Sequence, residues 1–470
     1  TPADLLEVAR RWLVPERSLL GAVLPEDTRV DEDALREALS SGVERCLRRY
    51  RAPCRSPAAG RSSDVESFEL ANGARLHVVA RRELPIVALR FAMLGGLLAE
   101  DSETAGANHF LAGMWMRGTH ARSAAGFARA VEALAGDVDG FSGRNSIGLT
   151  IEGTSDRILP LIDLGCEALL APALAEEELT RECGDTLAAL ARREDRLGAR
   201  AFDLFAQALY PTHPYRFSLL GEEATVKSFT PQSQRALHDR LVRGGNLDIG
   251  CVGDVDPEAL ASDLSVRLAE LPEGPPGFDL PPEDPFPDSP REVVQRKDRS
   301  QAHLVLGFPG LRLDDEDRYA LEVIAQVLGG QAGRLFLELR DKQSLAYSVS
   351  AFAADGVATG YFAFTIATAP EKFEVAKRGL FDEVERLLDE PPDEAELEAA
   401  KRQIVGSFVI EGQRAGARAF HMALDARYGL GADSASQTPE RVRAVSRADV
   451  TRVAARVFDL NRYVLAVVRP

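Results

Sequence analysis

The sequence predicts an α+β protein made of two repeated α/β units, each an antiparallel-rich sheet packed by helices, preceded by the tail of another such unit. Three observations lead to this prediction. Strand and helix patterns recur in the same order on both sides of a proline-rich segment, residues 272–292, which cannot propagate a helix. The chain of 470 residues is too long for one hydrophobic core. Its apolar fraction of 45% and charged fraction of 27% are those of a globular protein.

The two ends of the chain resemble each other. Residues 1–25 and 446–470 each read as an N-capped helix followed by a short apolar strand and a proline. A segment that closes the last unit therefore also opens the chain, and we predict that residues 1–25 are the closing helix and strand of a preceding domain. Residues 26–64 then form a helical linker. A coincidence between two capped endings is the alternative.

The first predicted unit covers residues 65–271. Apolar residues between 68 and 78 flank Asn72-Gly73, a pair that favours a tight hairpin. Periodicity predicts the other elements of this unit. Strands are expected at 86–93, 147–151 and 247–252, and helices at 106–119, 123–136, 155–170, 176–195, 199–209 and 230–243.

The second predicted unit, residues 293–470, follows the proline-rich linker and repeats the order of the first. A strand is expected at 304–308, helices at 315–328 and 333–342, and alternating strands at 345–349 and 362–366. Long helices and the closing helix and strand complete it.

Charge and cysteine content exclude several functions. The net charge is −17, and no Lys/Arg stripe alternates with aromatic residues, which argues against nucleic acid as a partner. No apolar run approaches the length of a membrane span, and the first residues lack the zones of a signal peptide. We expect a soluble protein, and the sequence does not decide between a bacterial-type periplasm and the cytoplasm. The 5 cysteines lack CxxC spacing, which favours structural free thiols over a zinc or disulfide role.

Residues 106–119 combine a core helix with the frame of a zinc-binding motif. Phe110, Leu111, Met114 and Trp115 recur at the spacing of one buried helix face, and Gly118 is placed to end the helix. In the motif H-x-x-E-H, two histidines one turn apart bind a metal and the glutamate activates the bound water. His109 occupies the first position, but Ala112 replaces the glutamate and Gly113 the second histidine.

Four segments together resemble the pitrilysin/insulinase family of inverted-motif zinc peptidases. They are the His109 helix, residues 136–142, residues 210–221 and residues 329–349. The resemblance covers nearly the whole chain and implies a metallopeptidase-like fold. It also implies a third zinc ligand, a glutamate about 76 residues beyond the second histidine, and counting from Gly113 that position is Ala189.

Only His109 thus remains of the four chemical positions, and one imidazole cannot hold a catalytic zinc ion, which needs three protein ligands. We expect no cofactor in this chain and zinc in a separate catalytic half. His109 then reads as a core or pocket histidine. Replacement ligation by Glu182 or Glu194 is the alternative, although both have ordinary helix-surface interpretations.

The resemblance also implies an Arg and a Tyr seven residues later in the half that lacks zinc. Arg340 and Tyr347 fit this pattern. A phenol can donate to a carbonyl oxygen that gains negative charge, while a guanidinium steadies the substrate backbone. The alternative is that Arg340 only complements a helix dipole and Tyr347 is an ordinary strand aromatic.

Residues Asp139, Gly140 and Phe141 are the candidate substrate-binding residues. They belong to a predicted edge strand, residues 139–151, which by resemblance pairs with extended peptide. A plain sheet edge is the alternative.

The resemblance therefore implies the zinc-less half of a pitrilysin-type metallopeptidase, inactive alone, that encloses peptide and supplies Arg340 and Tyr347 to a zinc site elsewhere. The zinc-bearing partner is either an upstream part of the same polypeptide or a separate chain in a heterodimer. The alternative is a non-catalytic scaffold or peptide-binding subunit of the same fold. We expect neither nucleic acid nor a membrane span.

Overall fold

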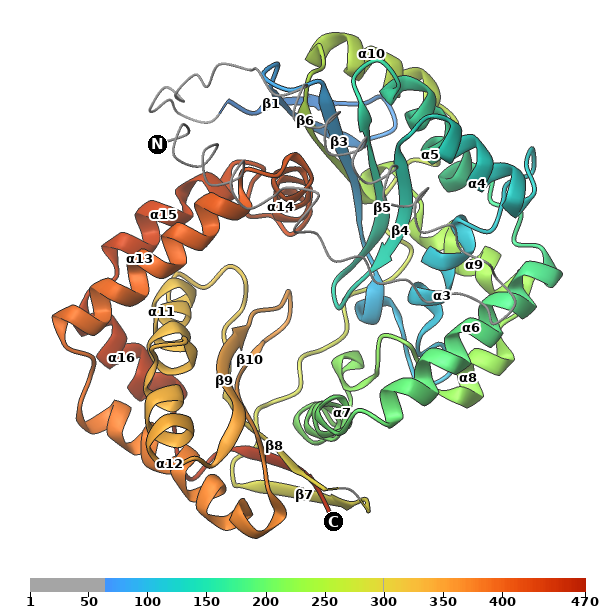
Figure 1. Cartoon of the computed structure of the whole chain (residues 1–470). Helices are drawn as coiled ribbons and strands as arrows, with labels where there is room; N and C mark the ends of the chain where they lie inside the picture. The colour runs from blue at the N-terminus through green and yellow to red at the C-terminus, as the bar shows by residue number, and fades with distance from the viewer. Residues whose placement is uncertain (1–63, 299) are drawn as a thin grey trace, which may run out of the picture. The chain divides into compact units, whose positions relative to one another are not determined.

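The computed structural model describes residues 64–298 and 300–470, which fall in one compact unit beginning at Ser63. The predictions for residues 1–25 and 26–64 lie outside the described residues, apart from Asp64. Within the described part, two sheets carry helices on their faces (Figure 1). No helix of this part is both long and apolar enough to cross a membrane.

The first sheet has the strand order β1-β2-β6-β3-β5-β4. Its strands are β1 (Glu66–Glu69), β2 (Arg75–Ala80), β3 (Ile86–Leu94), β4 (Asp137–Ser142), β5 (Ser146–Thr154) and β6 (Leu247–Gly253). Neighbours are antiparallel except β2 and β6, which are parallel. The predicted hairpin is present between β1 and β2, where Gly73 has a φ of 85° and Leu70 N donates to Ala74 O at 2.8 Å.

The second sheet has the strand order β7-β11-β8-β10-β9. Its strands are β7 (Arg291–Arg296), β8 (Ala302–Pro309), β9 (Ala346–Ala354), β10 (Tyr361–Thr368) and β11 (Val464–Arg469). Apart from β1, the two sheets share one topology: β2, β3, β4, β5 and β6 occupy the positions that β7, β8, β9, β10 and β11 hold in the second sheet. The parallel pair β2–β6 of the first sheet corresponds to the parallel pair β7–β11 of the second. The predicted α+β class with two repeated, antiparallel-rich units is confirmed.

The helices of the first half are η2 (Gly96–Ala99), α3 (Ala107–Trp115), α4 (Ala124–Ala133), α5 (Ile158–Leu170), α6 (Glu176–Glu194), α7 (Leu197–Leu209), η3 (Pro214–Arg216), α8 (Glu223–Ser228), α9 (Pro231–Leu241), η4 (Gly244–Asn246) and α10 (Pro257–Arg267). Those of the second half are α11 (Arg318–Gly329), η5 (Phe336–Lys342), η6 (Pro370–Lys372), α12 (Phe373–Asp389), α13 (Glu394–Glu411), α14 (Ala415–Arg427), α15 (Ser434–Ala444) and α16 (Arg447–Val457).

Two predicted elements differ from the structure. The helix expected at 333–342 is largely the π-helix η5. A π-helix has a wider turn than an α-helix, but a segment of 7 residues is too short for the spacing of its apolar residues to distinguish the two. The single strand expected at 139–151 is two strands, β4 and β5, because the chain turns at residues 143–145, where Gly143 N donates to Ser146 O at 2.8 Å. Of these two strands, only β4 lies at an edge of the sheet, since β5 pairs with both β3 and β4.

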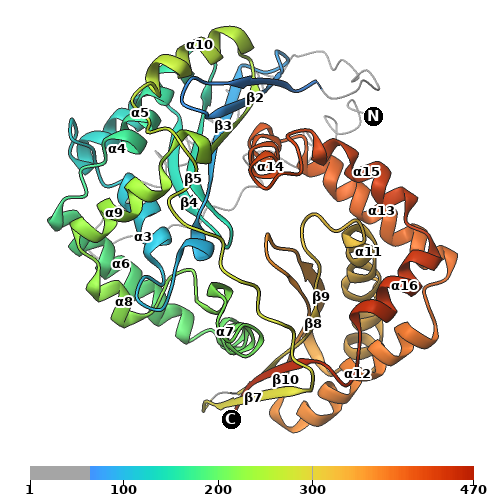
Figure 2. The same ribbon diagram turned by 180° about the vertical axis from the view of Figure 1, so that it is seen from behind.

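The two halves exchange helices (Figures 1 and 2). Helix α7 of the first half packs on strands β8 and β11, and helix α14 of the second half packs on strands β3 and β6. Glycines permit both contacts, because a Cβ on Gly307 would overlap the Phe205 ring and a Cβ on Gly250 would overlap the Ala419 carbonyl. The segment between the halves adds a further connection. In it Asp284 accepts from the His213 amide at 2.7 Å.

Candidate functional site

Helix α3 carries the incomplete zinc motif and is fixed at its first turn. The Glu100 carboxylate accepts from the Gly106 and Asn108 amides, both at 2.8 Å. Asn108 Oδ1 in turn accepts from the Gly96 amide at 2.9 Å. The predicted inward face is confirmed, since Phe110, Leu111, Met114 and Trp115 are all fully buried. The helix therefore holds its motif positions in a well-defined place.

The motif positions now face an ion pair. Gly113 lies against α6, where a Cβ would overlap Glu182 Oε1 and lie 2.9 Å from Glu182 Cδ. Arg117 Nε donates to Glu182 Oε2 at 2.9 Å, and its Nη2 pairs with Asp185 at 2.5 Å. His109 is half-buried. Burial lowers the pKa of His109, and the nearby Glu182 charge opposes part of that shift.

These residues do not fit a catalytic zinc ion. Ala112, Gly113 and Ala189 offer no donor atom, and Glu182 already pairs with a guanidinium. Across residues 64–298 and 300–470, no group of three His, Cys, Asp or Glu side chains is placed to hold a metal. The Arg117–Glu182 pair was missed in the sequence. In the sequence, Glu182 and Asp185 lie three residues apart on a predicted helix, which places both carboxylates on one face, but no local pattern indicates that Arg117 lies opposite them.

The candidate substrate strand lies directly against the incomplete motif. Strand β4 crosses α3 so closely that a Cβ on Gly140 would overlap the Ala112 carbonyl. Asp139 is exposed, and its carboxylate accepts from the Gly140 amide at 2.8 Å. Phe141 packs edge-to-face on Phe420 of α14, with 5.1 Å between ring centroids. The structure therefore brings Asp139, Gly140 and Phe141 together with the motif helix.

Arg340 lies in the π-helix η5, which packs against strand β9. Its guanidinium carbon lies 4.3 Å from the centroid of the Phe336 ring, and the side chain is half-buried. The turn into β9 is tightly fixed. Ser344 has a φ of 51° and donates its amide to Arg340 O at 3.0 Å, and the Leu345 amide donates to Leu339 O at 2.8 Å. π-helical turns occur frequently at functional sites.

Tyr347 occupies a β-bulge in the edge strand β9. Across the β9–β10 pair, Ser348 is opposite Ala367 and Ala346 is opposite Thr368, so Tyr347 is the extra residue. Its side chain lies outside what the structure describes. Bulges re-aim side chains and are frequent next to active sites. The backbone therefore places the two candidate residues on either side of one short turn in the second half, whereas His109 lies on helix α3 of the first half.

Three cysteines fall in the described residues, and all three are free thiols, as predicted: Cys166, Cys183 and Cys251. Burial raises the pKa of both Cys166 and Cys251 to about 12, so these two thiols are unreactive near neutral pH. Cys46 and Cys54 lie outside the described residues.

Two family descriptions match adjacent parts of the chain. Residues 79–223 match the insulinase family, peptidase family M16, and residues 228–404 match the peptidase M16 inactive domain. The chain belongs to the insulinase family. The resemblance drawn from the four sequence segments is thereby confirmed.

Two relatives are named zinc proteases, and two solved structures share the fold. An uncharacterized zinc protease of Streptomyces coelicolor is 29% identical over 364 residues, 73% of this chain and 78% of the relative. The uncharacterized zinc protease YmxG of Bacillus subtilis is 25% identical, over 74% of this chain and 84% of its own length. A crystal structure described as a peptidase M16 inactive domain from Pseudomonas fluorescens has a TM-score of 0.80 at 23% identity, covering 87% of this chain and 98% of that one. A Helicobacter pylori protease has a TM-score of 0.81 at 19% identity, covering 86% and 99%.

Proposed function

We propose that this insulinase-family chain is the zinc-less half of a two-half peptidase, supplying Arg340 and Tyr347 to a zinc site held by another half or chain. The observation that carries the proposal is the contrast between the two constellations. Three of the four zinc-motif positions carry Ala or Gly, and the Arg117–Glu182 ion pair fills the space beside Gly113. Arg340, in contrast, lies in a π-helix joined through a fixed turn to a bulged edge strand. The match to the M16 inactive domain supports the same assignment.

The proposed chemistry uses only side chains that this chain can present. When an amide carbonyl is attacked, its oxygen gains negative charge, and the Tyr347 phenol donates a hydrogen bond to it. The Arg340 guanidinium holds the neighbouring substrate backbone in place. The edge strand β4, with Asp139, Gly140 and Phe141, pairs with extended peptide that the two halves enclose. Substrates are therefore unfolded peptides.

The first prediction concerns Arg340 and Tyr347 in the assembled enzyme. Arg340→Ala and Tyr347→Phe should each lower kcat/KM by roughly 100- to 1000-fold, because a donor to the developing oxyanion or its positioning partner is lost. The measurement is cleavage of a quenched fluorescent peptide by this chain combined with a zinc-bearing M16 half. Thermal melting should stay within about 2 °C of the parent.

Matched controls are Arg378→Ala and Tyr463→Phe. Arg378 is exposed and pairs with Asp382 along α12, and the Tyr463 hydroxyl donates to Glu292 at 2.8 Å near the start of β11. Both controls should keep full turnover. Unchanged turnover in Arg340→Ala and Tyr347→Phe would instead favour the alternative, a non-catalytic peptide-holding subunit, for which the β4 edge beside Ala112 is the specific observation.

The second prediction concerns the chain by itself. It should cleave no peptide with added zinc, because the residues at positions 112, 113 and 189 provide no ligand. Peptide cleavage by the purified chain that chelators abolish and zinc restores would overturn the proposal.

A further inference from the structure

Ser67, His77 and Asp248 lie in a row across three neighbouring strands of the first sheet. Ser67 on β1 is directly opposite His77 on β2, and its Oγ lies 2.8 Å from His77 Nδ1. On the other side of the ring, His77 Nε2 lies 3.1 Å from Asp248 Oδ1 on β6. A hydroxyl, an imidazole and a carboxylate are therefore joined by two hydrogen bonds.

The surroundings of Asp248 decide which ring nitrogen carries the proton. Asp248 is fully buried, and its carboxylate pairs with Arg75 at 2.8 Å and Arg427 at 3.4 Å. Burial opposes its ionisation, but the hydrogen bonds from His77 and Arg75 and the Arg427 charge outweigh burial and hold the pKa of Asp248 below its usual value. An ionised carboxylate can only accept, so the proton is on His77 Nε2.

This tautomer leaves the lone pair of His77 Nδ1 pointing at Ser67. The serine hydroxyl therefore donates to a base whose opposite nitrogen is held by a carboxylate, which is the arrangement that activates a nucleophilic serine. The ring is reversed relative to the familiar triad, in which Nε2 faces the nucleophile. Either nitrogen of a neutral imidazole can accept a proton, so the reversal does not prevent base catalysis.

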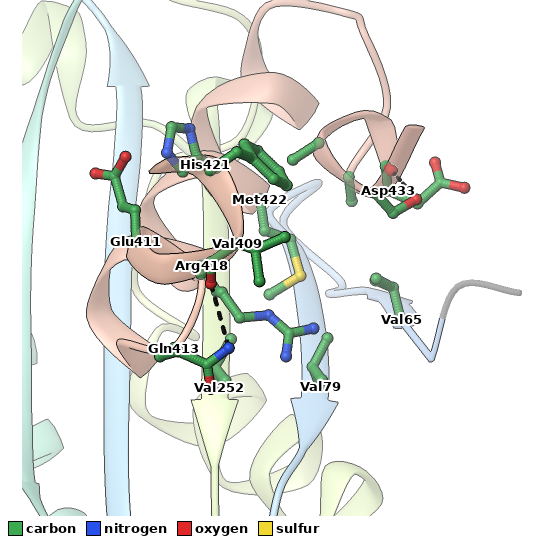
Figure 3. Close-up of a pocket in the computed structure, with 15 residues that line it drawn as sticks. Val65, Val79, Val252, Val409, Glu411, Gln413, Arg418, His421, Met422 and Asp433 are labelled. Atoms are coloured by element: carbon green, nitrogen blue, oxygen red, sulfur yellow. Dashed lines mark hydrogen bonds between the residues drawn. The ribbon is translucent and has the colours of Figure 1, made fainter. Parts of the chain in front are cut away.

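The triad opens into a cavity. Ser67 is exposed, whereas His77 is only 6% exposed. Ser67, Arg75 and His77 line a cavity of about 290 Å³, together with Val65 and the α14–α15 turn. A neighbouring cavity of about 270 Å³ shares Val65 on its wall and is mostly apolar. Figure 3 shows the residues around this second cavity: the apolar Val65, Val79, Val252, Val409 and Met422, and the polar Glu411, Gln413, Arg418, His421 and Asp433.

We propose that Ser67 is a catalytic nucleophile that attacks esters of short apolar acyl groups, with His77 as the general base. Its Oγ bonds to the ester carbonyl carbon while its proton moves to His77 Nδ1. The C–O bond to the alcohol then breaks, and the alcohol leaves with that proton. Water attacks the acyl-serine by the same route, which releases the carboxylic acid and restores Ser67. Arg75, which lines the same cavity, donates from Nε and Nη2 to Asp248 and so holds the carboxylate that orients His77.

This activity is independent of the proposed peptidase role. It requires no metal, and the triad strands carry neither Arg340 nor Tyr347. It therefore persists in the purified chain and in the presence of a chelator, conditions under which the proposed peptidase function is absent. Success or failure of the esterase test says nothing about the Arg340 pair.

The test uses the full chain in EDTA with an alkyl fluorophosphonate probe. Wild-type protein should form a phosphonate ester at Ser67 with loss of fluoride, located by peptide mass spectrometry. Ser67→Ala should lose that adduct, and it should hydrolyse p-nitrophenyl butyrate at least 10-fold more slowly. His77→Gln, which keeps a polar group opposite Ser67, should lower both labelling and hydrolysis at least 10-fold.

Ser265→Ala is the matched control. Ser265 is an exposed serine on α10 that lines neither cavity, and its hydroxyl donates to the Ala261 carbonyl at 2.7 Å instead of to an imidazole. This variant should label and hydrolyse like wild type. Absence of an adduct at Ser67, or equal hydrolysis by wild type and Ser67→Ala, would overturn the proposal. Ser67→Ala removes only an exposed hydroxyl, so it decides the question even if His77→Gln is poorly folded.

Discussion

Gly113 shows how a single missing side chain changes a site. The space next to its Cα is filled by the Glu182 carboxylate, which Arg117 neutralises. An acidic group that could have approached a metal thus became one partner of an ion pair between helices α3 and α6. At position 113 a histidine side chain and the Arg117–Glu182 ion pair would need the same space, so the two arrangements exclude each other.

A third prediction follows at Gly113. Gly113→His should destabilise the protein by about 1–3 kcal/mol, because its side chain must displace Glu182 from Arg117. It should not create a zinc site, since positions 112 and 189 remain alanine. Urea denaturation and a metal assay check the two parts. The control is Gly184→His on the facing helix α6, where a Cβ meets nothing within 4 Å. Stability equal to wild type together with bound zinc in Gly113→His would contradict this account.

Individual site residues were partly predictable from sequence. The loss of ligands at Ala112, Gly113 and Ala189 could be counted along the chain. The partner that fills the space, Arg117 with Glu182, could not, because it depends on how α3 and α6 meet. The Ser67–His77–Asp248 row was also hidden, since strand pairing joins residues that are far apart in sequence.

Among the elements, helix α3 is held by a buried acid at its N-terminus. Glu100 is 6% exposed and accepts two amide hydrogen bonds from the first turn of the helix. Burial raises its pKa to about 7, against the opposing effect of those hydrogen bonds. Its folded-state pKa is thus above the unfolded value of 4.5, so its contribution to stability is fully present below pH 4.5 and declines as pH rises through 7.

The fourth prediction concerns this pH dependence. Between pH 5 and about pH 8, wild-type protein should lose on the order of 3 kcal/mol of unfolding free energy relative to Glu100→Gln, which cannot ionise. The measurement is urea denaturation of both proteins across that range. Glu103→Gln is the control, because Glu103 is exposed next to the same turn. Parallel stability curves for wild type and Glu100→Gln would contradict the assignment.

Most elements could be predicted because their apolar residues follow a clear period. The strands that became β3 and β6 and the helices that became α3 and α6 lie within a few residues of their expected limits. The β4–β5 turn was missed although Gly143 and Asn145 signal it, because the strand pattern resumes directly afterwards. The bulge at Tyr347 depends on the register with β10 and has no local signal.

At the scale of the whole molecule, the exchange of α7 and α14 couples the two halves. An amphipathic pattern tells which face of a helix is buried but not which sheet it covers, so the sequence predicted two successive units without this exchange. The Pro-rich linker and the unit boundaries at residues 271 and 293 stay predictions. The packing of α14 on β3 and β6 nevertheless makes the first sheet depend on the end of the chain.

The fifth prediction tests this coupling. Gly250→Ala should destabilise the protein by about 3 kcal/mol, because the new methyl group overlaps the Ala419 carbonyl and pushes α14 away from β6. Gly307→Ala should have a similar effect through Phe205 of α7. The control is Gly406→Ala in α13, where a Cβ meets nothing within 4 Å, and it should be neutral or slightly stabilising. Denaturation curves of the three variants decide, and near-wild-type stability of Gly250→Ala would contradict the described packing.

The position of α14 also matters while the protein is being made. The strands of the first sheet are complete once Gly253 has been added, whereas α14, which covers Val79 and Val252, begins only at Ala415. At roughly 5–20 residues per second, the ribosome leaves this apolar face bare for on the order of ten seconds. Nascent chains therefore expose an apolar surface during this interval, and we expect chains truncated before Ala415 to aggregate.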